Sequence, residues 1–167
     1  CLQGVEQPRA RSPERTVAPV RRVDRERPRI GHGVVLNDQV LQPPGWEKPK
    51  GYSNGVAAEG RQVFVAGQIG WNAACRFDSD DFVAQTRQAL ANIVAVLAEA
   101  GAKPEHIVRM TWYVTDKREY LSRGREVGAV FRELIGVYHA AMSAVQVSAL
   151  MEDRAKVEIE VTAVIPR

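Results

Sequence analysis

The stretch "DDFVAQTRQALANIVAVLAEAGAKP", residues 80–104, decides the fold prediction, and "HIVRMTWYVTD", residues 106–116, follows it closely. Apolar side chains in the first stretch recur every three or four residues, the period of a helix with one buried face. The predicted buried face consists of Phe82, Thr86, Ala89, Ile93, Val96, Leu97 and Ala100. The residues able to cap its start are Ser79, Asp80 and Asp81. Gly101 and Pro104 end the helix, and the β-branched and aromatic residues of the second stretch predict a strand.

Further elements extend outward from this helix–strand unit. "RQVFVAG", residues 61–67, predicts a strand before it, and "KREYLSRGREVGAVFRELIG", residues 117–136, predicts a helix after it. Two more strands are predicted at 144–150 and 156–164, where apolar and polar residues alternate. This order favours an α+β fold, with α/β as the alternative. We expect a two-layer sandwich in which two helices cover one face of a mixed sheet.

The other face of the predicted sheet carries polar side chains, which require either water or a second subunit. These polar residues are Arg109, Thr111, Gln146, Ser148 and Glu158. The set is too mixed for a core, so it suits an oligomer's inner surface or a cleft between subunits. Glu158 and Glu160 fall on the same face of the last strand, and adjacent carboxylates favour a cation, a metal or a proton. Glu160 is interpreted as a surface charge.

Charge is unevenly distributed along the chain. Residues 1–36 hold eight Arg and four acidic residues, a net charge of +4, whereas residues 37–167 hold 15 basic and 16 acidic residues, a net charge of −1. The first segment is rich in Arg and Pro without apolar periodicity, so we favour a disordered extension over a nucleic-acid-binding arm. Residues 37–167 are predicted to form a single domain.

Several function classes are disfavoured by what the sequence lacks. The spacing of Cys and His matches no metal motif, so no metal is expected. No apolar run is long enough to cross a membrane. The two cysteines do not suggest a disulfide framework, which favours a reducing, cytoplasmic setting.

Four segments together resemble the RidA/YjgF family of imine and enamine deaminases, whose members are also labelled endoribonuclease L-PSP or translation inhibitor. They are "KPKGYSNGV" (48–56), "VFVAGQIGW" (63–71), "QTRQALANIVAVLAEAGAKPEHIVRMTWYVTD" (85–116) and "KVEIEVTAV" (156–164). The resemblance covers roughly residues 42–165 in the family's order and spacing.

This resemblance implies a chorismate-mutase-like fold and a homotrimer with three clefts between subunits. It also implies hydrolysis of a reactive enamine or imine to a keto acid and ammonia, with no metal or organic cofactor.

The resemblance also assigns site residues. Tyr52 matches the family's cleft tyrosine, and Glu158 matches the glutamate that positions the attacking water or moves a proton. Gly67 and Gln68 match the turn whose backbone groups hold a carboxylate or orient a water. Trp71, directly after that turn, is predicted to add an aromatic wall to the cleft.

The sequence departs from the family at the arginine that grips the substrate carboxylate, because Met142 stands in that position. The family's helix Asn is also missing near Gly124, and Ala144 replaces its usual cysteine. A methionine cannot pair with a carboxylate, so small 2-imino acids are expected to bind weakly. A larger, more apolar substrate similar to aminomuconate fits better. The conjectured substitute cations are Arg109, Arg123, Arg125 and Arg154.

Each assigned residue has a structural alternative. Glu158 can be a sheet-face carboxylate that bonds a neighbouring strand, Tyr52 can pack its own loop, and Trp71 can pack at a trimer rim. His139 can face the cleft, where it would titrate near neutral pH.

Three functions therefore compete. The first is a hydrolytic deaminase with a changed substrate. The second is a non-catalytic trimer that binds a small molecule or a protein, which the loss of the arginine favours. The third is a ribonuclease or nucleic-acid binder, which the net charge of residues 37–167 disfavours.

Overall fold

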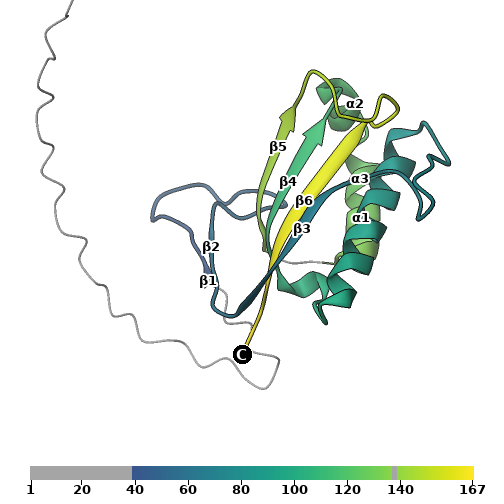
Figure 1. Ribbon diagram of the computed structural model, residues 1–167. Coiled ribbons are helices and arrows are strands. Elements are labelled where there is room, and N and C mark those ends of the chain that lie inside the picture. The colour runs from purple at the N-terminus through teal and green to yellow at the C-terminus, as the bar shows by residue number, and fades with distance from the viewer. Residues whose placement is uncertain (1–38, 137–138) are drawn as a thin grey trace, which may run out of the picture. The chain divides into compact units, whose positions relative to one another are not determined.

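The computed structural model describes residues 39–136 and 139–167 of the chain, and the predicted extension over residues 1–36 lies outside these ranges. A four-stranded sheet has the order β3-β6-β4-β5, in which only the β4–β5 pair is parallel. The helices cover one face of this sheet (Figure 1), as the predicted α+β sandwich requires. Its elements are β3 (Arg61–Ile69), α1 (Phe82–Glu99), β4 (Ile107–Val114), α2 (Lys117–Ser122), α3 (Gly124–Leu134), β5 (Ala141–Gln146) and β6 (Val157–Ile165).

Helix α1 forms as its sequence predicts. The Asp81 side chain caps it by accepting a hydrogen bond from the backbone N–H of Ala84, at 2.9 Å. The predicted face is buried from Phe82 to Leu97, with Val96 as the exception because it is 41% exposed. Each fully buried Leu or Phe on this face stabilises the fold by about 1.5–3 kcal/mol. Gly101 ends the helix in the left-handed conformation, at φ 68°.

The predicted second helix is two helices, because α2 ends before Arg123 and α3 begins at Gly124. The Arg123 side chain bonds Asp81 at 2.9 Å and also bonds Glu126, so the break is tied to the start of α1. Gly124 fits at the beginning of α3, where a glycine costs less than inside a helix.

The hydrophobic core lies between the helices and the sheet. Trp112 is 2% exposed and contacts the rings of Tyr120 and Phe131. Its Nε1 is buried without a hydrogen-bond partner among the described residues. His106 accepts a hydrogen bond at Nδ1 from the backbone N–H of Lys103 in the short 3₁₀ turn Pro104–His106, before β4. No helix in the described part of the chain has the length and apolar character needed to cross a membrane.

The prediction for β5 was wrong in both its bounds and its orientation. This strand spans Ala141–Gln146, and Val145 pairs with Tyr113 on the face away from the helices. Met142 pairs with Met110 and packs against the core. Gln146 accepts a hydrogen bond from the backbone N–H of Lys117, so it lies on the helix side rather than with Arg109 and Glu158.

A second, two-stranded sheet precedes β3. It pairs β1 (Gln39–Val40) with β2 (Val56–Ala57), and β2 also contacts β4. Large apolar groups remain on the sheet face away from the helices, which we call the open face. Phe64 is 72% exposed and Val145 is 45% exposed there. This face therefore has apolar surface without a partner in one chain.

Candidate functional site

A β-bulge in β3 places Gly67 against Glu158. The pairing of β3 with β6 shifts between Val65 and Gln68, so β3 has one residue more than β6 over this interval. A Cβ atom added at Gly67 would overlap the carboxylate of Glu158. The glycine is thus required for this position of Glu158, and the structure brings together these two predicted site residues.

Gln68, the third residue of this group, turns back to its own strand. Its side-chain amide donates a hydrogen bond to the backbone oxygen of Ala66, at 3.1 Å. The side chain of Gln68 therefore stabilises the bulge, while its backbone pairs opposite Ile159. The assigned role of the Gly67–Gln68 backbone toward a ligand stays a prediction.

The two glutamates of β6 have different partners. The Tyr113 hydroxyl donates a hydrogen bond to Oε1 of Glu160, at 3.2 Å, so Glu160 has a contact within its own chain besides the surface charge predicted for it. Tyr113 is also the residue directly opposite Glu158 on β4. Within the described ranges, no side-chain hydrogen bond or ion pair involves Glu158, whose side chain is half-buried. Its carboxylate is available to a water or a ligand.

Burial and the neighbouring carboxylates define the electrostatics of this group. Desolvation raises the pKa of Tyr113, as do the hydrogen bond to Glu160 and the charges of Glu160 and Glu158. The positive charge of Arg109 lowers the pKa of the same hydroxyl. Tyr113 is absent from the predicted site residues, although its alternation with the core residue Trp112 along β4 indicates the polar face.

Tyr52, His139 and Met142 form a second group at the start of β5. The backbone N–H of Ser53 donates to the oxygen of Ala140 at 2.9 Å, which fixes the Tyr52 loop beside this strand. The Tyr52 side chain is 46% exposed and His139 is exposed, so both are accessible. Met142 is half-buried and packs partly on the core, which limits how much of it a ligand can contact.

Trp71 is in neither group, because it contacts Phe77 in its own loop. It forms an isolated backbone bridge and a ring contact with Phe77, with ring centroids 6.4 Å apart. Asn92 of α1 donates a hydrogen bond to the Trp71 backbone oxygen at 2.9 Å. The ring is half-buried in its own loop, so its predicted role as a cleft wall stays a prediction.

The two groups lie at opposite edges of the sheet. Gly67 is on β3, and Met142 is on β5, with β6 and β4 between these two edge strands. Three strand spacings separate the edges by about 14 Å. Met142 and Glu158 also lie on opposite faces of the sheet. One chain therefore does not assemble all the predicted site residues around one substrate-sized space.

Three of the four candidate substitute cations are excluded from the open face. Arg123 bonds Asp81 and Glu126, Arg154 bonds Asp80 at 2.8 Å, and Arg125 lies on α3, on the helix side. Arg109 is exposed on β4 opposite Thr162, on the same face as Glu158. It forms no ion pair with any residue in the described ranges.

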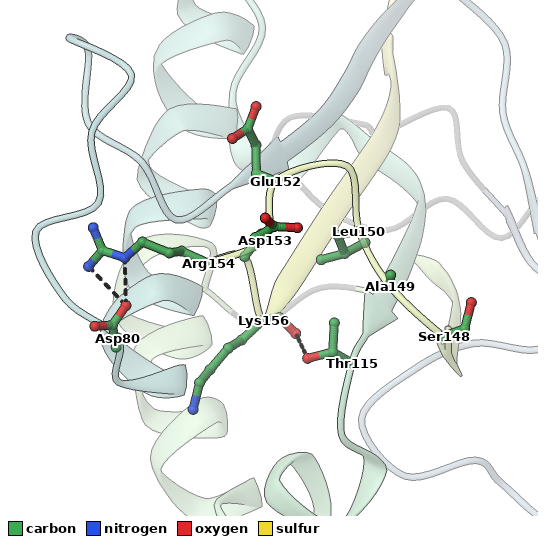
Figure 2. A pocket seen from close by; sticks show the side chains of 10 residues that line it. Asp80, Thr115, Ser148, Ala149, Leu150, Glu152, Asp153, Arg154 and Lys156 are labelled. Carbon is green, nitrogen blue, oxygen red and sulfur yellow. Dashed lines mark hydrogen bonds and ion pairs between the residues drawn. The ribbon is translucent and has the colours of Figure 1, made fainter.

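A pocket of about 520 Å³ lies at the start of β6 (Figure 2). It is lined by Asp80, Thr115, Ser148, Ala149, Leu150, Glu152, Asp153, Arg154, Ala155 and Lys156. Its two cations are occupied, because Arg154 pairs with Asp80 and Lys156 pairs with Glu119. None of the predicted site residues lines it. Among the described residues no cluster of His, Cys, Asp or Glu could hold a metal ion.

Comparison with known proteins finds relatives of this chain both in sequence and in three-dimensional structure. Residues 46–165 match the family described as endoribonuclease L-PSP. The 2-iminobutanoate/2-iminopropanoate deaminase of Escherichia coli is 34% identical over 105 residues, which are 63% of this chain and 80% of that protein.

Two solved structures extend this similarity to three dimensions. The conserved Rid family protein YyfB from Yersinia pestis has a TM-score of 0.67 at 34% identity, over 78% of this chain and 100% of that one. A member of the YjgF/YER057c/UK114 family from Mycobacterium tuberculosis has a TM-score of 0.52 at 41% identity, over 69% and 87%.

Proposed function

The chain belongs to the RidA/YjgF family, with its chorismate-mutase-like fold, and we propose that it hydrolyses reactive imines and enamines to a carbonyl compound and ammonia. The family includes imine deaminases, as the name of the Escherichia coli relative states. The observation that carries the proposal is the Glu158 carboxylate, which rests against Gly67 without a side-chain partner in the described ranges.

The proposed reaction uses Glu158 as a general base. As the oxygen of a water bonds to the imine carbon, Glu158 accepts one of its protons. The nitrogen receives that proton, which gives the neutral carbinolamine. Glu158 then takes the proton of the new hydroxyl and returns it to the nitrogen as the C–N bond breaks, so that the C=O bond forms and ammonia leaves. An enamine first takes a proton at carbon and gives up one from nitrogen to become the imine. Backbone groups at Gly67 and Gln68 are proposed to orient the water or a substrate carboxylate.

The proposed substrate is larger and more apolar than a 2-imino acid, in the manner of 2-aminomuconate. Met142 supports this, because it offers no charge for a carboxylate and is packed partly on the core. Losing a desolvated bidentate contact with a carboxylate costs on the order of 2–5 kcal/mol. Of the four conjectured substitute cations, Arg109 is the one exposed on the face of Glu158, and turnover of a small 2-imino acid would show that it serves a carboxylate. Trp71 and His139 remain proposed substrate contacts.

We further propose that the site is completed between copies of the chain, as in a homotrimer. Two observations support this proposal. Tyr52 and Met142 are at the β5 edge, whereas Gly67 is at the β3 edge, so the edges of two copies are needed to bring them together. The open face also exposes Phe64 and Val145, which a second copy would cover. A single domain over residues 37–167 and a cytoplasmic location belong to the same proposal.

The second candidate function is a non-catalytic module that binds a small molecule or a protein. The observation that favours it is Met142 in place of an arginine. The family description as an endoribonuclease raises RNA cleavage as a third outcome, which the net charge of −1 over residues 37–167 disfavours.

Ammonia release from freshly generated substrates tests the proposal. The purified full chain is supplied with 2-aminoacrylate and with 2-aminomuconate, and the Glu158→Ala variant is the control. We expect turnover of 2-aminomuconate that the variant lacks. Efficient turnover of 2-aminoacrylate would show that another cation serves its carboxylate, and turnover of neither would favour the binding module. Cleavage of RNA retained after deletion of residues 1–36 would favour the third outcome.

A further inference from the structure

Two carboxylates on one strand face compete for the same chemistry unless their surroundings distinguish them. Glu158 and Glu160 are two residues apart on β6, so their side chains leave the sheet in the same direction, roughly 7 Å apart. Either one is an adequate base for a water molecule. Their surroundings differ, because Glu158 rests against Gly67 whereas Glu160 accepts a hydrogen bond from the Tyr113 hydroxyl at 3.2 Å.

We infer that Tyr113 is a positioning residue, which holds Glu160 on the β4 side and so leaves Glu158 as the one carboxylate free to accept a proton from the attacking water. This inference rests on the proposed deaminase function. It adds to that function a hydrogen bond that holds Glu160 and leaves the Glu158 carboxylate free to act as the base.

The geometry around Tyr113 supports this role. Its Cα pairs directly with that of Glu158, yet its hydroxyl donates to Glu160, so the side chain reaches along β6 past its own register partner. The charged groups that influence Tyr113 are Glu158 and Glu160 from β6 and Arg109 from its own strand. Its neighbour on β5 is the apolar Val145. Glu160 is therefore the acceptor, and no side chain of β5 competes for the hydroxyl.

Without the hydroxyl, the Glu160 carboxylate loses its only side-chain hydrogen bond in the described part of the chain. It can then bind the water or the imine nitrogen in a non-productive position, or turn toward Arg109. Small displacements of this kind reduce catalysis strongly, because the reacting atoms must be closely aligned.

A suppressor experiment tests whether Tyr113 acts through Glu160. Tyr113→Phe is expected to lower kcat roughly tenfold to hundredfold with little change in KM. Glu160→Gln retains an acceptor for the hydroxyl but is a far weaker base, so its kcat stays near that of the wild type. The double variant, Tyr113→Phe with Glu160→Gln, is expected to recover most of the lost kcat, because the competing carboxylate is gone.

Tyr120→Phe is the matched control. Tyr120 is also a half-buried tyrosine next to β4, but it lies on the helix side against Trp112 and Phe82, and its hydroxyl forms no hydrogen bond with the residues that the structure describes. The same chemical change there should leave kcat unaltered. If Tyr113→Phe lowered kcat only by disturbing the structure, adding Glu160→Gln would not restore kcat.

An alkaline absorbance titration tests the contact independently of activity. The difference between the wild type and Tyr113→Phe isolates the ionisation of Tyr113, whose pKa is raised by burial, by the bond to Glu160 and by nearby charge. Glu160→Gln should move this ionisation to lower pH, because it removes the neighbouring charge. An unchanged ionisation would overturn the inference, since Tyr113 would then not contact Glu160.

The outcomes separate the inference from the function on which it rests. An active wild type, an inactive Glu158→Gln variant and an unaffected Tyr113→Phe variant would overturn the inference and leave the proposed function intact. A loss in Tyr113→Phe that the double variant does not recover would do the same. A wild type that turns over neither imine would overturn both.

Discussion

Gly67 and Glu158 occupy adjoining positions on neighbouring strands, so that any side chain at Gly67 would collide with the Glu158 carboxylate. The bulge between Val65 and Gln68 creates this arrangement by adding one residue to β3. The bulge therefore lies against Glu158, the one carboxylate of β6 without a side-chain partner in the described ranges. The proposed role of Glu158 as a general base depends on this position of its carboxylate.

Gly67→Ala is expected to displace Glu158 and to reduce imine turnover at least tenfold, because general-base catalysis requires hydrogen-bond distance to the water. The three atoms nearest to the added methyl belong to the flexible, half-buried side chain of Glu158, which can move away, so the unfolding free energy should change by less than about 1 kcal/mol. Steady-state kinetics and urea unfolding measure the two effects.

Gly124→Ala is the control for this substitution, because a Cβ at Gly124 would have nothing within 4 Å. It should leave turnover unchanged and stabilise α3 by up to about 1 kcal/mol. If Gly67→Ala behaves like Gly124→Ala in the kinetic assay, the close approach of Gly67 and Glu158 has no role in catalysis.

Asp81 should make stability depend on pH. The backbone N–H of Ala84 and the Arg123 guanidinium lower its pKa in the folded chain. Its contribution is therefore present above the unfolded-state pKa, which is about 3.9, and is lost as the pH falls through the lower folded value. Unfolding free energies of the wild type and Asp81→Asn should differ most at neutral pH and converge in acid. A difference that grows in acid would contradict this sign.

Asp81→Ala separates the cap from the charge. It removes the hydrogen bond to Ala84 as well as the pair with Arg123, and a lost N-cap costs about 1 kcal/mol. Asp81→Asn retains an acceptor for the cap and should cost less. Urea unfolding at one protein concentration measures both, since association of copies would otherwise alter the apparent stability.

Gln85 is expected to be the most sensitive polar residue of the fold. It is 1% exposed, donates to the backbone oxygens of Ser79 and Arg154, and accepts from the N–H of Lys156 at 2.9 Å. Gln85→Leu leaves these groups without partners and should cost about 2–4 kcal/mol of unfolding free energy. Gln88→Leu, one turn along α1, removes only a bond to Asn92 and should cost less than about 1 kcal/mol. Equal costs would mean that water replaces the partners of Gln85.

A site shared between copies predicts complementation of two inactive variants. Tyr52→Ala alters the β5 edge, and Glu158→Gln alters β6, so a mixed assembly contains some interfaces with both residues intact. Co-expression of the two variants, with different affinity tags for purification of mixed assemblies, should recover part of the wild-type turnover. Mixed assemblies without any recovery would indicate that each chain holds a complete site.

The layout of the fold could be predicted where local signals agree. In α1, the apolar period, the cap at Asp81 and the stop at Gly101 all indicate the same helix. In β6, the alternation from Val157 to Ala163 matches its burial, because the core covers one face throughout. Tertiary contacts favour the same helix at α1 and the same strand at β6 as the local sequence does.

The remaining errors come from contacts that a local pattern does not contain. β5 is an edge strand whose residues are half-buried or exposed, so alternation does not reveal which face meets the core, and Gln146 lies on the helix side instead of the predicted polar face. The break at Arg123 depends on Asp81, which is distant in the sequence. The Tyr113–Glu160 bond depends on the register of β4 and β6, which no single strand specifies.

The most direct test of the central claim compares Glu158→Gln with Glu160→Gln in the ammonia-release assay with 2-aminomuconate. The two variants lose the same charge from the same strand face, two residues apart. Glu158→Gln is predicted to lose roughly a hundredfold or more in kcat, while Glu160→Gln stays near the wild type. Wild-type turnover by Glu158→Gln would contradict the claim that this carboxylate activates the water.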